Sequence, residues 1–155
     1  MKKEQIVDFT RRISQANRSG LVVVMYDIFF TYLDDARAAY DAADWDAYKE
    51  ALRRAQRAID ELISALNFSY DMAKNLYSIC RDSIAKSLYK RDLADAEDAC
   101  RLMKKLYDGF VHAAEQDHSE PLMKNTQQVY AGYTYGRDNL VETCQDSDSS
   151  RGFLV

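Results

Sequence analysis

The feature that most constrains this chain is the spacing of apolar residues from Trp45 onward. They recur at alternating steps of three and four: Trp45, Tyr48, Leu52, Ala55, Ile59, Leu62 and Leu66. Residues three or four apart lie on one side of an α-helix, so this spacing predicts a helix with a single buried stripe. Such a stripe needs neighbouring helices to pack against, and the pattern therefore predicts a helical bundle.

Few residues in the chain interrupt helices. The 155 residues include one Pro and five Gly, and 47% of them are hydrophobic. This length is enough for one core and short for two, and the scarcity of helix breakers favours long helices over strands joined by turns. We therefore expect a single all-α domain.

Four long helices are predicted from the same spacing and from residues that cap helix ends. The expected ranges are 18–42, 44–66, 69–90 and 92–116. The caps, whose side-chain oxygens accept hydrogen bonds from first-turn amides, are Asn17 or Ser19, Asp44, Ser69 and Asp92. Short connections place consecutive helices side by side and antiparallel, so the expected fold over 18–117 is an up-down four-helix bundle.

The two ends of the chain differ from the bundle. Residues 1–17 carry apolar residues at helical spacing between charges, so a short helix or an ordered arm is expected there. Pro121 suits the first turn of a short fifth helix over 118–136. Residues 137–155 include the polar run QDSDSSR and are expected to form a flexible, partly disordered tail.

Charge and composition exclude several classes of function. A net charge of -4 with a pI near 5.2 argues against a nucleic-acid partner. The apolar run from Leu21 to Phe30 is interrupted by Asp27 and is shorter than a membrane span, and the N-terminus lacks the apolar core of a signal peptide. Three cysteines without metal-ligand spacing indicate reduced thiols. We expect a cytoplasmic protein with no metal, no cofactor and no membrane insertion.

The first long helix has more apolar surface than a bundle helix requires. Its apolar arc covers about 220°, against about 180° for the third helix and about 100° for the second. The strip that contains Asp27, Thr31, Asp34 and Asp35 is expected to face solvent. Two interpretations stay open: the N-terminal arm or the fifth helix covers the surplus, or the surplus forms a groove for a partner.

Residues in three of the predicted helices, and one before the fourth, match the motifs of one protein family. The second helix has AQ, I, EL and LN at the family's intervals, in Ala55, Gln56, Ile59, Glu61, Leu62, Leu66 and Asn67. The matches elsewhere are Met25, Tyr26 and Asp27 in the first helix, Tyr77 and Ile84 in the third, and Asp92 before the fourth. Over about residues 13–114 the chain thus resembles the flagellar secretion chaperone family, FliS.

The resemblance implies a non-enzymatic export chaperone. It would bind the disordered C-terminal segment of flagellin, prevent premature polymerisation and assist delivery to the flagellar type III export apparatus, with other export components as possible partners. The client is expected to lie in apolar grooves. The expected client contacts are Val23, Phe30, Tyr70, Tyr77 and Leu88, with Phe9 and Ile13 as possible gate residues.

The chain departs from the family pattern at its N-terminus. Family members often carry an Asn-Pro-Tyr motif in the segment that can cover the client groove, and this motif is absent here. Asn17 and Arg18 also replace the usual Ser-Pro or Thr-Pro opening of the first helix, which keeps the cap and loses the proline. Gating by residues 1–17 therefore has no motif to support it.

Two other functions are compatible with a helical bundle. Di-iron bundles use paired Glu-x-x-His motifs, and Glu115 and His118 have this spacing, but the only other histidine has Gly109 three residues before it. The second alternative is an adaptor of the same fold that binds a different protein, with the C-terminal tail as its recognition element.

Overall fold

Five helices make up the described part of the chain, which in this computed structural model comprises residues 1–65 and 71–123. They are α1 (Lys3–Gln15), α2 (Arg18–Asp41), α3 (Trp45–Ala65), α4 (Asp71–Lys90) and α5 (Ala94–Gln116). The predicted all-α class is confirmed, and α2 to α5 lie within two residues of their predicted bounds.

The predictions for the segments on either side of the bundle had different outcomes. Residues 3–15 form a helix, which decides between the two possibilities left open for the N-terminal arm. Of the fifth helix predicted over 118–136, residues 118–123 are not helical and the remainder lies outside the described residues. The tail predicted over 137–155 also lies outside them.

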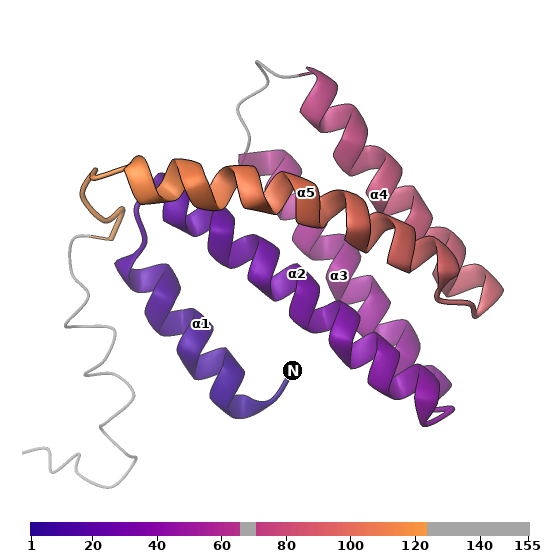
Figure 1. Cartoon of the computed structure of the whole chain (residues 1–155). Coiled ribbons are helices and arrows are strands. Elements are labelled where there is room, and N and C mark those ends of the chain that lie inside the picture. Colours follow the sequence, from indigo (N-terminus) through magenta and orange to yellow (C-terminus); the bar gives the residue numbers. More distant parts are fainter. Residues whose placement is uncertain (66–70, 124–155) are drawn as a thin grey trace, which may run out of the picture. The chain divides into compact units, whose positions relative to one another are not determined.

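Helices α2 to α5 pack in a ring. Each packs against the next in the sequence, and α5 returns to pack against α2 (Figure 1). Because the connections are short, consecutive helices run antiparallel, as predicted for an up-down-up-down bundle. Helix α1 stands outside the ring and lies alongside α2 (Figure 1).

The connection between α2 and α3 shows how the sequence sets this antiparallel order. Ala43 adopts a left-handed conformation with φ of 52°. Its N–H donates to the Tyr40 carbonyl at 3.0 Å, and the N–H of Asp44 donates to the Ala39 carbonyl at 2.9 Å, which closes the end of α2. The Asp44 side chain then accepts a hydrogen bond from the N–H of Ala47 at 3.0 Å and so caps α3, as predicted.

The core between the four bundle helices contains large apolar side chains and a few paired polar groups. Tyr48 of α3 donates from its hydroxyl to the carbonyl of Ser87 on α4 at 3.0 Å. The Ser87 hydroxyl accepts from the N–H of Ala96 on α5 at 2.7 Å, so one buried serine links three helices. The largest fully buried side chains include Tyr26, Phe29, Leu33, Leu52, Ile59, Leu62, Tyr77, Ile84 and Met103.

Candidate functional site

A surface of half-buried apolar side chains follows the contact between α2 and α5. Val23 and Phe30 are seven residues apart on α2, which places them within about 20° of one another around the helix. Tyr107 and Phe110 are three residues apart on α5. The rings of Phe30 and Tyr107 meet edge to face with centroids 5.5 Å apart. We call Val23, Phe30, Tyr107 and Phe110 the α2–α5 seam.

Tyr26 forms the buried floor of the seam. Its ring centroid lies 5.8 Å from that of Tyr107 and 5.6 Å from that of Phe110. Its hydroxyl lies 2.5 Å from the hydroxyl of Tyr77 on α4. Burial raises the pKa of both tyrosines, so both remain neutral at ordinary pH. The seam therefore rests on a floor that is tied by a hydrogen bond to the opposite side of the bundle.

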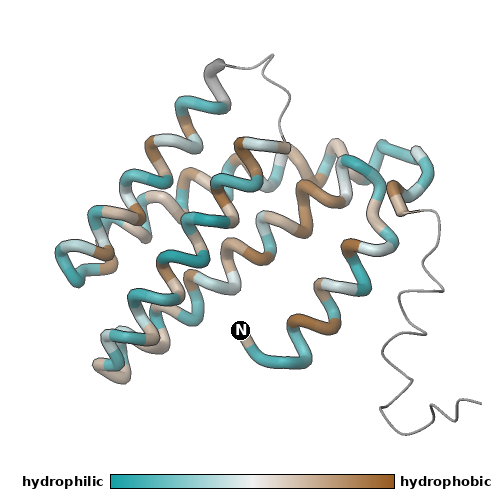
Figure 2. Tube along the Cα trace, turned by 180° about the vertical axis from the view of Figure 1, so that it is seen from behind, coloured by the Kyte–Doolittle hydropathy of each residue, from teal (hydrophilic) through white to brown (hydrophobic). Residues whose placement is uncertain are grey.

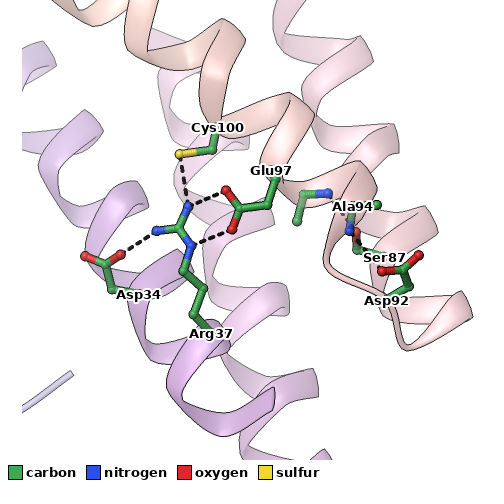
Figure 3. Close-up of polar contacts among 8 residues, drawn as sticks. Asp34, Arg37, Ser87, Asp92, Ala94, Glu97 and Cys100 are labelled. Carbon is green, nitrogen blue, oxygen red and sulfur yellow. Dashed lines mark hydrogen bonds and ion pairs between the residues drawn. The ribbon is translucent and has the colours of Figure 1, made fainter. Parts of the chain in front are cut away.

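A charged cluster, separate from the seam, also fixes α2 against α5. The Arg37 guanidinium donates to both carboxylate oxygens of Glu97, at 2.5 Å from Nε and 2.8 Å from Nη2 (Figure 3). It also donates to Asp34 at 2.5 Å and approaches the Cys100 sulfur at 3.4 Å. This pairing lowers the pKa of Glu97. Two parallel bonds fix the relative orientation of the two helices, so the contact does not depend on the apolar seam alone.

Helix α1 borders the seam through Asp27, which falls between Val23 and Phe30 in the sequence. Asp27 forms an ion pair with Arg12 of α1. Burial raises the pKa of the Tyr107 hydroxyl and the nearby Asp27 carboxylate raises it further, so Asp27 lies close to both α1 and the seam.

Helix α1 is amphipathic, and one of its apolar residues is buried. Apolar and polar stretches alternate along it (Figure 2). Phe9 is buried, and the Arg12 guanidinium lies 5.7 Å from the centroid of its ring. Helix α1 therefore docks on α2 through an apolar contact next to a charged one.

The strip of α2 that was expected to face solvent is partly exposed and carries ion pairs. Asp27 pairs with Arg12, Asp35 pairs with the amino group of Met1, and Asp34 pairs with Arg37. The expectation holds for Asp34, whose side chain is 71% exposed, whereas Asp27, Thr31 and Asp35 are half-buried. Helical periodicity shows which residues share a face but not which cations another segment brings to it.

The structure brings together only some of the residues predicted to contact a client. Val23 and Phe30 are half-buried on one face of α2, whereas Tyr77 is fully buried in the core. Leu88 is half-buried on α4, which packs against α3 and α5. Tyr70 lies outside the described residues. The predicted gate residues lie on α1, where Phe9 is buried and Ile13 is half-buried.

Sequence reasoning did not assign Tyr107, Phe110 or Arg12 to the site. A usable signal existed for Tyr107. Met103 and Leu106 already supply the apolar stripe of α5, so an additional aromatic residue at 107 widens the stripe toward a neighbouring surface. Arg12 gave no comparable signal, because its partner Asp27 is distant in the sequence and a charged residue on a short helix usually faces solvent.

The chemistry of the seam is suited to binding apolar side chains. Within the described ranges, no three His, Cys, Asp or Glu side chains are grouped closely enough to hold a metal ion. Glu115 and His118, the Glu-x-x-His pair noted in the sequence, are both exposed. None of the described helices is both long enough and apolar enough to span a bilayer.

Sequence comparison decides the family. The sequence model of the family described as "Flagellar protein FliS" matches residues 2–117, a range that includes α1 and all four bundle helices. The chain belongs to the FliS family. No curated protein and no solved structure matches the chain.

Membership of the FliS family makes this protein a flagellar export chaperone. The matched range begins eleven residues earlier than the region of resemblance seen in the sequence motifs, which started at about residue 13. Helix α1 therefore lies within the part of the chain that the FliS model recognises, although the Asn-Pro-Tyr motif is absent.

Proposed function

We propose that this FliS protein binds the disordered C-terminal segment of flagellin in the bacterial cytoplasm. Binding would keep flagellin from polymerising and would assist its delivery to the flagellar type III export apparatus, where other export components are possible partners. Family membership supports the export role. The observation that carries the proposal for the client site is the α2–α5 seam, where the half-buried rings of Phe30, Tyr107 and Phe110 contact the buried ring of Tyr26 and half-buried Val23 shares the α2 face of Phe30.

The mechanism follows from the chemistry of a disordered client. An extended segment folds locally into amphipathic turns and places apolar side chains against the seam. Ordering the client takes about 2–5 kcal/mol from the gross interaction energy, so an extended contact is needed rather than one pocket. A rigid receptor keeps this cost low on its own side, and the Tyr26–Tyr77 and Arg37–Glu97 contacts provide that rigidity.

The proposed contact set is revised from the sequence prediction. Val23 and Phe30 are kept, and Tyr107 and Phe110 are added because they complete the same surface. Leu88 and Tyr70 stay as predictions for a longer contact that continues beyond α2 and α5. Tyr77 contributes from beneath, because its fully buried side chain holds Tyr26 in place.

Helix α1 is proposed to act as a reversible cover at the border of the seam. Phe9 is buried and Ile13 is half-buried on α1, and Arg12 pairs with Asp27 beside Tyr107. A client that needs the surface next to Asp27 would displace α1. The free energy of undocking α1 would then reduce the apparent affinity for the client.

Calorimetry with the C-terminal segment of the organism's own flagellin tests the client site. Val23→Lys should weaken binding at least about tenfold, because it places a charge on a surface that becomes buried in the complex. Ile79→Lys is the matched control: Ile79 is 56% exposed on α4 and should tolerate lysine without loss of affinity. Circular dichroism should show the same helicity for both variants.

The heat-capacity change of binding the flagellin segment distinguishes the client model from the adaptor alternative. Burial of apolar surface by a client predicts a clearly negative value. Equal affinities for the wild type and Val23→Lys would remove the seam from the proposal. Failure of the wild type to bind flagellin would instead favour an adaptor of the same fold that binds a different protein.

A further inference from the structure

Ala16 and Asn17 connect α1 to α2 and form a two-residue hinge. The segment that follows α5 forms hydrogen bonds with this hinge. We propose that residues 117–122 form a latch that controls the release of α1, so that α1 can swing away from α2 freely only after this segment lets go of the hinge. The latch consists of hydrogen bonds between Asp117, Ser119 and Leu122 on one side and Ala16, Asn17 and Ser19 on the other.

Both hinge residues take part in the latch. The carbonyl of Ala16 accepts a hydrogen bond from the N–H of Leu122 at 3.0 Å. The Asn17 side-chain amide donates to the Asp117 carbonyl at 2.8 Å and to the Ser119 carbonyl at 3.4 Å. Two turns of chain that are about a hundred residues apart in the sequence are thus tied at the point where α1 must pivot.

Asn17 couples the latch to the start of α2. Its Oδ1 accepts from the N–H of Gly20 at 2.8 Å and caps α2, while its Nδ2 holds Asp117. These two bonds fix the orientation of the amide, and Ser19 adds a hydrogen bond to the Asp117 carboxylate at 2.5 Å. A rotation at Ala16 and Asn17 that moved α1 outward would have to break the Leu122 bond or carry the segment with it.

The latch is built to be reversible. Its contacts are polar, and Leu122 at its end and Met123 just beyond it are 57% and 47% exposed. Opening therefore exchanges protein hydrogen bonds for bonds to water and exposes little apolar surface, so its net cost is small. A brace that served only stability would be expected to bury these side chains.

The carboxylate of Asp117 organises the segment. It accepts from Ser19 through one oxygen and from the N–H of Ser119 through the other, at 3.0 Å, which folds the chain back toward the hinge. Hydrogen bonds from Ser119 and Ser19 lower the pKa of Asp117 to about 2, so its carboxylate is charged at neutral pH.

Amide hydrogen exchange on the full-length protein tests the latch without any client. In Asp117→Ala and Ser19→Ala, amides of residues 6–15 in α1 should exchange roughly three- to tenfold faster, the range expected for the loss of one or two net hydrogen bonds. Amides of residues 55–62 in α3 should keep their wild-type rates. Glu120→Ala is the matched control, because Glu120 is an exposed carboxylate of the same segment that makes no hydrogen bond or ion pair within the described part of the chain.

Three outcomes would overturn the latch. These are unchanged exchange of α1 in both variants, an equal increase in α1 and α3, and an increase in Glu120→Ala as large as in Asp117→Ala. Because the readout needs no flagellin, the latch can fail while the proposed function stands, and the reverse also holds. Only one consequence rests on the proposed function: if α1 covers the client surface, Asp117→Ala should also bind the flagellin segment more tightly than the wild type.

Discussion

The hydroxyl groups of Tyr26 and Tyr77 form a polar pair inside an otherwise apolar part of the core. Each is the hydrogen-bond partner of the other at 2.5 Å, and both side chains are fully buried. A buried hydroxyl that loses its partner keeps the cost of desolvation without the compensating bond. The stability of the bundle at this point therefore depends on having both hydroxyls or neither.

A double-mutant cycle tests this dependence. Tyr77→Phe and Tyr26→Phe should each lower the free energy of unfolding by about 1–3 kcal/mol, because each leaves one hydroxyl unpaired. The double variant should lose no more than either single variant. Urea denaturation measures all four proteins, and additive losses would contradict the pairing.

The position of Tyr77 also shows the limit of sequence reasoning for single residues. Its place on the third predicted helix, which has a broad apolar arc, and its match to a family tyrosine suggested a client contact. Periodicity gives the direction in which a side chain points but not the depth at which neighbouring helices bury it. A charged substitution at Tyr77 is therefore expected to unfold the bundle rather than to weaken client binding selectively.

At the scale of elements, helix bounds were predictable and helix docking was not. Asn17 and Asp44 cap α2 and α3 as expected, because a cap is decided by residues within one turn of it. The packing of α1 on an acidic strip of α2 depends on the pair Arg12 and Asp27, whose meeting requires the finished hairpin of α1 and α2. The return of residues 117–122 to the hinge had no signal for the same reason.

Adjacent arginines in α1 provide a matched test of its docking. Arg12 pairs with Asp27 on α2, whereas Arg11 pairs with Asp8 inside α1. In Arg12→Gln, chymotrypsin should cleave after the buried Phe9 several-fold faster than in the wild type, because α1 undocks more often. Arg11→Gln should be cleaved at close to the wild-type rate.

Cleavage rates that rose equally in both arginine variants would indicate a general loosening of α1 instead of a specific contact. If α1 covers the client surface, Arg12→Gln should also bind the flagellin segment more tightly, and Arg11→Gln should not.

For the whole molecule, buried groups that resist ionisation set the response to alkaline pH. Burial raises the pKa of the Cys80 thiol to about 11, and burial together with Asp92 raises that of Tyr48 to about 12. Burial also raises the pKa of Tyr26. In the unfolded chain these groups lose their protons at lower pH than in the native state, so deprotonation favours unfolding.

Stability should accordingly be retained up to about pH 9, the ordinary range of a thiol, and should fall as pH rises toward 11–12. Urea midpoints measured between pH 7 and about 11 would show the decline. Cys80→Ala should reduce the fall of the urea midpoint at the lower end of this pH range. Tyr89→Phe, which changes a side chain that is 92% exposed, should leave the pH dependence of the urea midpoint unaltered. A wild-type midpoint that stayed constant to pH 11 would contradict this account.

The ring of helices has a topological consequence. Asn17 at the start of the bundle and Asp117 at its end are joined by a hydrogen bond. The first and last residues of the four-helix bundle therefore lie next to each other. Joining these two residues by a short peptide and opening the chain at the exposed turn around Ala43 would give a circular permutant that retains every bundle helix. Such a rewired protein would lack both terminal extensions while keeping the seam, and it would show how much of the chaperone's behaviour belongs to the bundle itself.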